Sequence, residues 1–190
     1  MNNPRHTTAL VALFAALMAV FGLIPKLDLP LGVPITLQTL GVMLAGALLG
    51  PRRALLAMGL FLGAVAIGLP LLSGGRGGLG VFLAPSAGYL VSWPLGAFVT
   101  GLVMAQLPTG TPRAAALSAF VAACVGGLLV VHAGGVVGLV LLAKMGWAQA
   151  ITGTLVFVPG DLIKAVLTAA VVHTVARGLP DWQLGGRAAR

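Results

Sequence analysis

The chain has 190 residues, of which 59% are hydrophobic and 7% are charged, and its mean hydropathy is +1.09. A soluble domain carries about 25% charged residues, so this composition excludes a water-soluble globular protein and predicts an integral membrane protein. The net charge of +8 would suggest nucleic acid as a partner of a soluble chain. Here the distribution of the charges between loops explains it, and we expect no nucleic-acid partner.

Six segments are apolar enough to cross a bilayer, which takes about 20 apolar residues in a helix. In chain order, we predict helices at about 9–25, 33–50, 53–70, 85–106, 114–132 and 149–177. Residues 134–146 are too few for an ordinary span and either extend the fifth helix or form a short interfacial helix. The sequence therefore predicts one all-α transmembrane domain over residues 1–190.

The positive charges indicate how these six helices are oriented. With six spans, seven arginines fall on one side of the membrane and only three basic residues on the other: Arg5, Arg52, Arg53, Arg113, Arg177, Arg187 and Arg190 against Lys26, Arg76 and Lys144. Loops rich in Lys and Arg stay in the cytoplasm. We therefore expect cytoplasmic N and C termini in a multi-pass protein of the inner (plasma) membrane.

Sequence signatures of catalysis and of metal binding are missing. The chain has no G-x-x-x-x-G-K-[ST] phosphate loop, no H-E-x-x-H motif, no G-x-S-x-G elbow and only one cysteine, Cys124. His132 and His173 fall near opposite ends of their spans, and we interpret both as interfacial or packed residues. We therefore expect no catalytic residues, no metal and no cofactor.

The last apolar segment contains the most informative pattern, "VFVPGDLIKAVL" at residues 156–167. Proline suits the first turn of a helix and interrupts its interior, so we predict that the last helix is interrupted at Pro159-Gly160 and begins again there. Asp161 then lies in a first turn, where the helix dipole favours an anion, and Lys164 lies on the same face. Each charge alone would be costly in the bilayer. The pair is either a ligand site facing the bundle interior or a structural ion pair.

Further polar residues are expected near the same end of the bundle. Gln38 lies at the start of the second predicted span, after a loop containing prolines, and the glycine-rich loop 73–89 contains Arg76, Gly78, Ser86 and Tyr89. Glycine lets a loop approach a ligand closely or act as a lid. Arg76 either meets a ligand carboxylate or is a solvated loop charge. Tyr89 is a candidate ligand contact or an aromatic anchor at the membrane interface.

The first span has small residues spaced four apart, Ala12 with Ala16 and Ala15 with Ala19. Such faces allow helices to approach closely. They indicate either packing within this chain or a surface for a partner.

Three stretches together resemble one known family. The segments "VPITLQTLGVMLAGALLGPRRALL" (33–56), "GLPLLSGGRGGLGVFLAPSAGYL" (68–90) and "FVPGDLIKA" (157–165) resemble the BioY family, the biotin-specific substrate-binding (S) components of energy-coupling factor (ECF) transporters. The resemblance covers nearly the whole chain. It implies six transmembrane helices with biotin bound near the extracellular side.

The resemblance also implies roles for individual residues. Asp161 and Lys164 are expected to contact biotin, with the glycine loop and Tyr89 helping to enclose it. The alanine motif of the first helix, Ala12/Ala16 or Ala15/Ala19, resembles the surface that docks on a transmembrane coupling (T) component, which works with a pair of ABC-type ATPases. The chain departs from the family pattern G-P-T-G-G-Y at "APSAGY" (84–89), where Ala84 and Ala87 replace glycines.

The expected function is therefore high-affinity capture of biotin from outside the cell for an ATP-driven importer. A stand-alone secondary transporter for biotin or another small vitamin, with Asp161 as a proton site, is the alternative. The latter needs no ATPase partner, so uptake by the chain alone separates the two.

Overall fold

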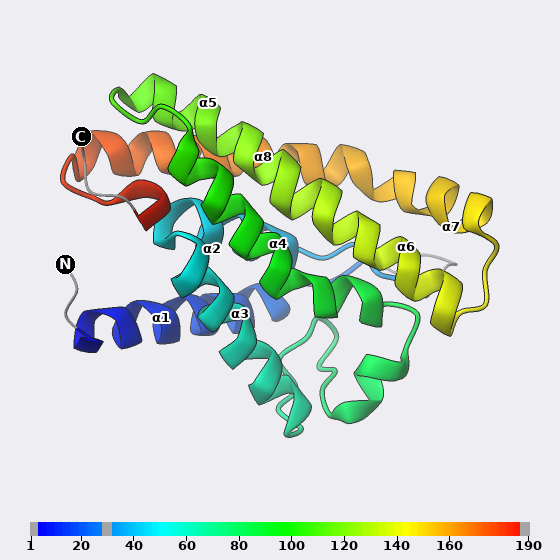
Figure 1. Cartoon of the computed structure of the whole chain (residues 1–190). Helices are drawn as coiled ribbons and strands as arrows, with labels where there is room; N and C mark the ends of the chain where they lie inside the picture. Colours follow the sequence, from blue (N-terminus) through cyan, green and yellow to red (C-terminus); the bar gives the residue numbers. More distant parts are fainter. Residues whose placement is uncertain (1–3, 28–31, 187–190) are drawn as a thin grey trace.

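The computed structural model describes residues 4–27 and 32–186, and this part of the chain consists of helices joined by loops (Figure 1). The helices group into six units, as expected from the sequence. The units are α1 (Pro4–Gly22), α2 (Gln38–Leu49), α3 (Pro51–Ala66), α4 (Ala87–Gln106), the joined elements α5 (Pro112–Ala122), η2 (Ala123–Val130) and α6 (Val131–Leu142), and the joined elements α7 (Trp147–Thr154), η3 (Leu155–Phe157) and α8 (Val158–Gly178). A short 3-10 helix, η1 (Leu79–Leu83), precedes α4, and another, η4 (Leu184–Gly186), follows α8.

The helices α2 and α4 form the centre of the bundle. Along one side α5 packs against α8, and on the other side α1 packs against α3, which also contacts α4 (Figure 1). The apolar side chains that these helices bury, with Met18, Met43 and Phe61 nearly inaccessible, form the core between them. Four runs in the described residues are long and apolar enough to cross a membrane: Arg5–Gly22, Ala87–Gln106, Pro112–Leu142 and Trp147–Gly178.

The second helix is shorter than its apolar sequence predicts. The prediction of helix over 33–50 is wrong for residues 33–37, because α2 begins only at Gln38. Proline disfavours the helical conformation of the residue before it, and Pro34 here follows Val33. The extended segment also pairs with the preceding loop, since Ile35 and Leu27 exchange backbone hydrogen bonds of 2.9 and 3.1 Å. This leaves residues 33–37 beside the central helices instead of within one.

Of the two alternatives for residues 134–146, the structure shows the first, an extension of the fifth helix. It does not end at His132 but continues through residues 134–142 to Leu142, so that Pro112–Leu142 forms one helical run of 31 residues. Its middle, Ala123–Val130, is a π-helix. Gly126 and Gly127 lie in this segment, where a Cβ on either would collide with side chains of the central helices, Thr100 and Met43 respectively. The glycines therefore let the wide π turn fit against α4 and α2.

The last helical unit changes to a tighter 3-10 turn before its charged residues. A 3-10 turn at Leu155–Phe157 separates α7 from α8, and α8 begins at Val158 with proline in its first turn. Pro159 and Gly160 thus lie inside the first turn of α8. Asp161 lies in that same turn, at the positive end of the helix dipole.

Glycines line the contact of α4 with the fifth helical run. A Cβ at Gly138 would come within 2.6 Å of Gly88 Cα, and a Cβ at Gly96 would come within 2.9 Å of the Gly126 carbonyl oxygen. Backbones can approach this closely only where side chains are small. These contacts bring the start of α4 against α6 and the middle of α4 against η2.

The basic loop residues separate between the two ends of the bundle. The first turn of α1, the α2–α3 junction, the α4–α5 loop and the end of α8 lie at one end, which we call the terminal end (Figure 1). This end carries Arg5, Arg52, Arg53, Arg113 and Arg177. The other end, which we call the pocket end, carries Lys26, Arg76 and Lys144. Arg187 and Arg190, which the sequence assigns to the first group, lie outside the described residues.

Candidate binding site

A pocket lies between the central helices and the start of α8, near the pocket end of the bundle. The space not filled by protein there, including the part that is open to the outside, is about 530 Å³. Its wall comes from the extended segment before α2, the loop before α4, and helices α2, α4, α6 and α8. The lining residues are Val33, Pro34, Ile35, Thr36, Gln38, Thr39, Leu72, Arg76, Ser86, Tyr89, Leu90, Trp93, Val131, His132, Phe157, Asp161 and Lys164.

Asp161 and Lys164 form a buried ion pair in this wall. Lys164 Nζ donates to Asp161 Oδ1 at 2.6 Å and to Thr39 Oγ1 at 2.7 Å, and Thr39 Oγ1 lies 3.0 Å from the same carboxylate oxygen. Asp161 is only 3% exposed and Lys164 only 8%. The predicted pair therefore exists and faces the bundle interior, and Thr39 of α2 joins it.

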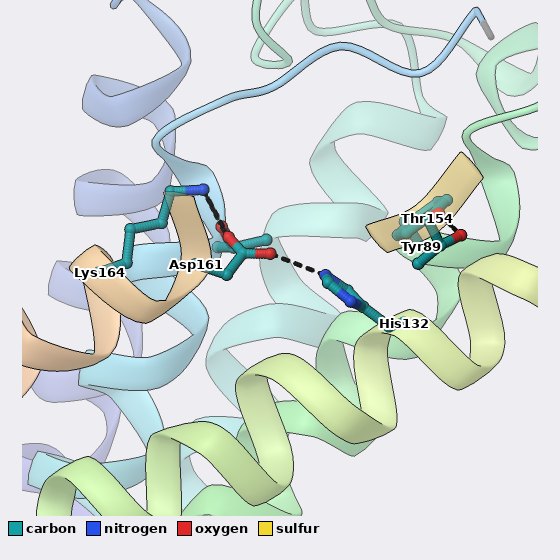
Figure 2. Close-up of polar contacts among 6 residues, drawn as sticks. Tyr89, His132, Thr154, Asp161 and Lys164 are labelled. Atoms are coloured by element: carbon teal, nitrogen blue, oxygen red, sulfur yellow. Dashed lines mark hydrogen bonds and ion pairs between the residues drawn. The ribbon is translucent and has the colours of Figure 1, made fainter. Parts of the chain in front are cut away.

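His132, from a third helix, also contacts Asp161. Its Nε2 lies 2.8 Å from Asp161 Oδ2, the carboxylate oxygen that Lys164 does not contact (Figure 2). Because an ionised carboxylate only accepts hydrogen bonds, Nε2 carries the proton in this arrangement. Asp161 thus receives hydrogen bonds on both oxygens, from donors on α2, α6 and α8.

Among the described residues, two buried polar atoms of the pocket have no hydrogen-bond partner. They are Ser86 Oγ and Trp93 Nε1, on side chains that are 3% and 4% exposed. A buried polar group without a partner costs about 1–3 kcal/mol. Both atoms belong to residues that line the pocket, so a ligand with suitable polar groups can satisfy them.

Aromatic rings form one wall of the pocket. Tyr89 packs edge-to-face on Phe157 and His132, with ring centroids 5.7 and 6.2 Å apart. The Tyr89 hydroxyl lies 2.7 Å from Thr154 Oγ1, so the polar end of the ring is tied to α7 (Figure 2). Gly135 leaves room for the Tyr89 ring, which a Cβ at this position would strike. The hydroxyl of Tyr89 is thus already engaged by Thr154, and its ring forms part of the pocket wall.

Gln38 lines the pocket, but its amide bonds to the protein itself. Nε2 donates to the carbonyl oxygens of Met18 at 3.2 Å and Leu71 at 3.1 Å. Oε1 accepts from the Ser73 backbone N–H at 3.3 Å. The side chain therefore connects α1, α2 and the loop that follows α3.

The two other loop residues proposed from sequence differ in position. Arg76 lines the pocket, and its Nε donates to the Ser73 carbonyl at 3.4 Å. Gly78 does not line it; its N–H donates to the Val65 carbonyl at 2.8 Å, and its φ of 81° is one that glycine adopts readily. The sequence could not separate the two, because both lie in one glycine-rich stretch.

The two alanines that depart from the G-P-T-G-G-Y pattern fit their positions. Ala84 has φ −77° and ψ 160°, an extended conformation open to any residue. Ala87 is the first residue of α4 and is buried. Neither position requires glycine, and Ser86 between them lines the pocket.

The small residues of α1 fall on two faces. Ala12 and Ala16 are exposed, whereas Ala15 and Ala19 pack against the hydrophobic core. Of the two pairs that the sequence offers for a partner, only Ala12/Ala16 lies on an outward face.

The sequence profile of the BioY family matches residues 2–181. The chain belongs to the BioY family. Within the family, it is similar to the biotin transporter BioY of Rhizobium etli, with 47% identity over 90% of this chain and 93% of that one. It is also 46% identical to the biotin transporter BioY of Rhodobacter capsulatus, over 93% of this chain and 96% of that one.

The chain also resembles a solved structure. The crystal structure of the S-component for biotin from an ECF-type ABC transporter matches it with a TM-score of 0.83 and 32% identity, covering 93% of this chain and 95% of that one. The fold described above is therefore that of a membrane transporter component and not of an enzyme.

Six of the seven candidate binding residues from the sequence line the pocket, and Gly78 does not. Gln38 is one of the six, but its amide is bonded to the protein itself. The interpretation of His132 as an interfacial or packed residue overlooked its bond to Asp161. A usable signal existed in the topology, because six spans place His132 and Asp161 at the same end of neighbouring segments. Trp93 also lines the pocket, and its ring lies 6.2 Å from that of Phe61, centroid to centroid.

Proposed function

We propose that this chain is the substrate-binding component of an ATP-driven vitamin importer and that it captures biotin in the pocket around Asp161. The observation that carries the proposal is the combination, in one pocket, of a buried Asp161–Lys164 pair with the unpartnered Ser86 Oγ and Trp93 Nε1. The names of two similar family members, both biotin transporters, support the choice of biotin.

The chemistry of biotin suits these groups. Its ureido ring has two N–H donors and one carbonyl acceptor, and its fused rings and side chain are mostly apolar. Asp161 can accept from a ureido N–H, while Trp93 Nε1 and Ser86 Oγ can donate to oxygen atoms of the ligand. Arg76, in the loop at the pocket end, is suited to the valerate carboxylate. The rings of Tyr89 and Phe157 supply an apolar wall.

We further propose that the terminal end of the bundle faces the cytoplasm and the pocket end faces the outside of the inner (plasma) membrane. The arginines of the terminal end support this orientation under the positive-inside rule. The pocket then opens toward the side from which a vitamin arrives.

The proposed partners are a transmembrane coupling component and a pair of ABC-type ATPases. The likeness to an S-component of an ECF-type ABC transporter supports this assembly. On this chain, the outward face of α1 around Ala12 and Ala16 is the proposed docking surface, since small residues allow a partner helix to approach closely.

The test is titration of the purified, detergent-solubilised protein with biotin, with desthiobiotin and thiamine as competitors. We expect saturable binding with one site per chain, competition by desthiobiotin and none by thiamine. A folded protein that does not bind biotin contradicts the proposal. Uptake measured with and without the ATPase and coupling subunits then separates an S component from a stand-alone transporter, which would import biotin unaided.

A further inference from the structure

The two carboxylate oxygens of Asp161 accept hydrogen bonds from different residues. Oδ1 is engaged by Lys164, one turn along the same helix, and by Thr39 of α2. Oδ2 is engaged by His132 at 2.8 Å. Without His132 the Asp161 carboxylate would be fixed at one oxygen only and could rotate about that contact.

The position of His132 depends on the π-helix that precedes it. A π turn adds a residue to the helical ladder and changes the face on which the following residues point. Residues 123–130 form this turn, and His132 lies two residues beyond it. Because Gly126 and Gly127 hold the turn tightly against α4 and α2, the direction of His132 is fixed by packing and not by a flexible loop.

The His132 ring is also held in orientation. Its centroid lies 6.2 Å from that of Tyr89 and 6.3 Å from that of Phe157, both in edge-to-face geometry. In Figure 2 the imidazole lies between the Asp161 carboxylate and the Tyr89–Thr154 pair. His132 is only 8% exposed, so water has little access to Nε2 and does not compete with Asp161 for its hydrogen bond.

We infer that His132 is a positioning residue for the ligand. With its proton on Nε2, His132 holds the Asp161 carboxylate in the orientation in which it can accept a hydrogen bond from a ligand N–H. This inference rests on the proposed biotin function. It gives a binding role to α6, which lies outside the three stretches of sequence that resemble the family.

The test is a double-mutant cycle on biotin affinity, since residues that act through one another show non-additive effects. Four proteins are compared by equilibrium dialysis with labelled biotin up to millimolar concentration: wild type, His132→Leu, Asp161→Asn and the double variant. We expect His132→Leu to weaken binding about tenfold, and the double variant to bind within about twofold of Asp161→Asn alone. Losses that multiply in the double variant would mean that His132 contacts biotin itself or acts only on packing, and would overturn the inference.

A second pair of variants guards against a folding defect. His132→Gln keeps an amide donor at a reach similar to that of Nε2, whereas the amide of His132→Asn is shorter. Binding by His132→Gln within about threefold of wild type, with a clear loss in His132→Asn at equal melting temperature, supports positioning. Equal affinity in His132→Leu or His132→Asn and wild type overturns the inference but leaves the proposed function intact. If the wild-type protein itself binds no biotin, the proposed function has failed instead.

Discussion

Gln38 connects three parts of the chain through one side chain. Its amide satisfies the carbonyls of Met18 and Leu71 and the N–H of Ser73, and it is 1% exposed. Backbone groups buried without partners are costly. The contacts make Gln38 a support of the loops around the pocket and not a free ligand donor.

Replacing Gln38 with leucine should therefore lower stability more than affinity. We expect Gln38→Leu to lose about 1–3 kcal/mol of the free energy of unfolding, seen as a lower melting temperature in detergent. Gln149→Leu, at an exposed amide on α7, is the matched control and should be nearly neutral. An unchanged melting temperature with tenfold weaker biotin binding would instead show that Gln38 contacts the ligand.

At the scale of single residues, the sequence shows which side chains are charged more readily than where a side chain points. Asp161 and Lys164 are conspicuous because charges within an apolar span need a partner, and three positions along a helix bring them together. Nothing in the sequence tells whether the Gln38 amide turns toward ligand or backbone. Likewise, the bond between His132 and Asp161 joins residues 29 positions apart, and spacing along one helix cannot reveal it.

At the scale of elements, the contact of α4 with the fifth helical run depends on glycine. A Cβ at Gly138 would meet backbone atoms of Gly88, whereas a Cβ at Gly63 on α3 would meet nothing within 4 Å. The same substitution should therefore destabilise the protein at Gly138 but not at Gly63.

We expect Gly138→Ala to lower stability by about 1–3 kcal/mol, as overpacking does. Gly63→Ala should be neutral or should add up to about 1 kcal/mol through helix propensity. Thermal unfolding of the two variants in the same detergent is the measurement. Equal melting temperatures would show that the close approach of α4 and α6 is not required.

The helices were predictable where apolar runs are long and unbroken, and less so at their ends. The run over 33–50 is apolar throughout, but Pro34 and the pairing of Ile35 with Leu27 keep its first part extended. The end of the fifth helix was ambiguous because residues 134–146 are short and rich in glycine. Glycine weakens a helix in isolation, yet here it permits the packing that continues the helix to Leu142.

At the scale of the whole molecule, the separation of basic residues predicts a single orientation in the membrane. Gly110 lies at the terminal end and Gly146 at the pocket end, and both are exposed with open space at their Cβ positions. In a Cys124→Ser background, Gly146→Cys should react with a membrane-impermeant maleimide in whole cells. Gly110→Cys should react only after the membrane is opened, and the reverse pattern would contradict the proposed orientation.

The outward face of α1 offers a second test at this scale. Ala12→Trp adds a large side chain to an exposed position, so we expect it to weaken co-purification with the coupling component while leaving biotin binding unchanged. Ala170→Trp, at an exposed alanine of α8, is the size-matched control. If Ala12→Trp leaves the complex intact, this face of α1 is not the docking surface.

The measurement that most directly tests the account is the affinity of the Asp161→Asn variant for biotin, determined by titration calorimetry. The substitution keeps the size of the side chain but removes the charge that Lys164, Thr39 and His132 surround. We predict at least tenfold weaker binding than wild type, equivalent to about 1.4 kcal/mol, with Asp181→Asn, at an exposed carboxylate, unchanged. An Asp161→Asn protein that binds biotin as tightly as wild type would contradict the claim that this buried carboxylate is the centre of the binding site.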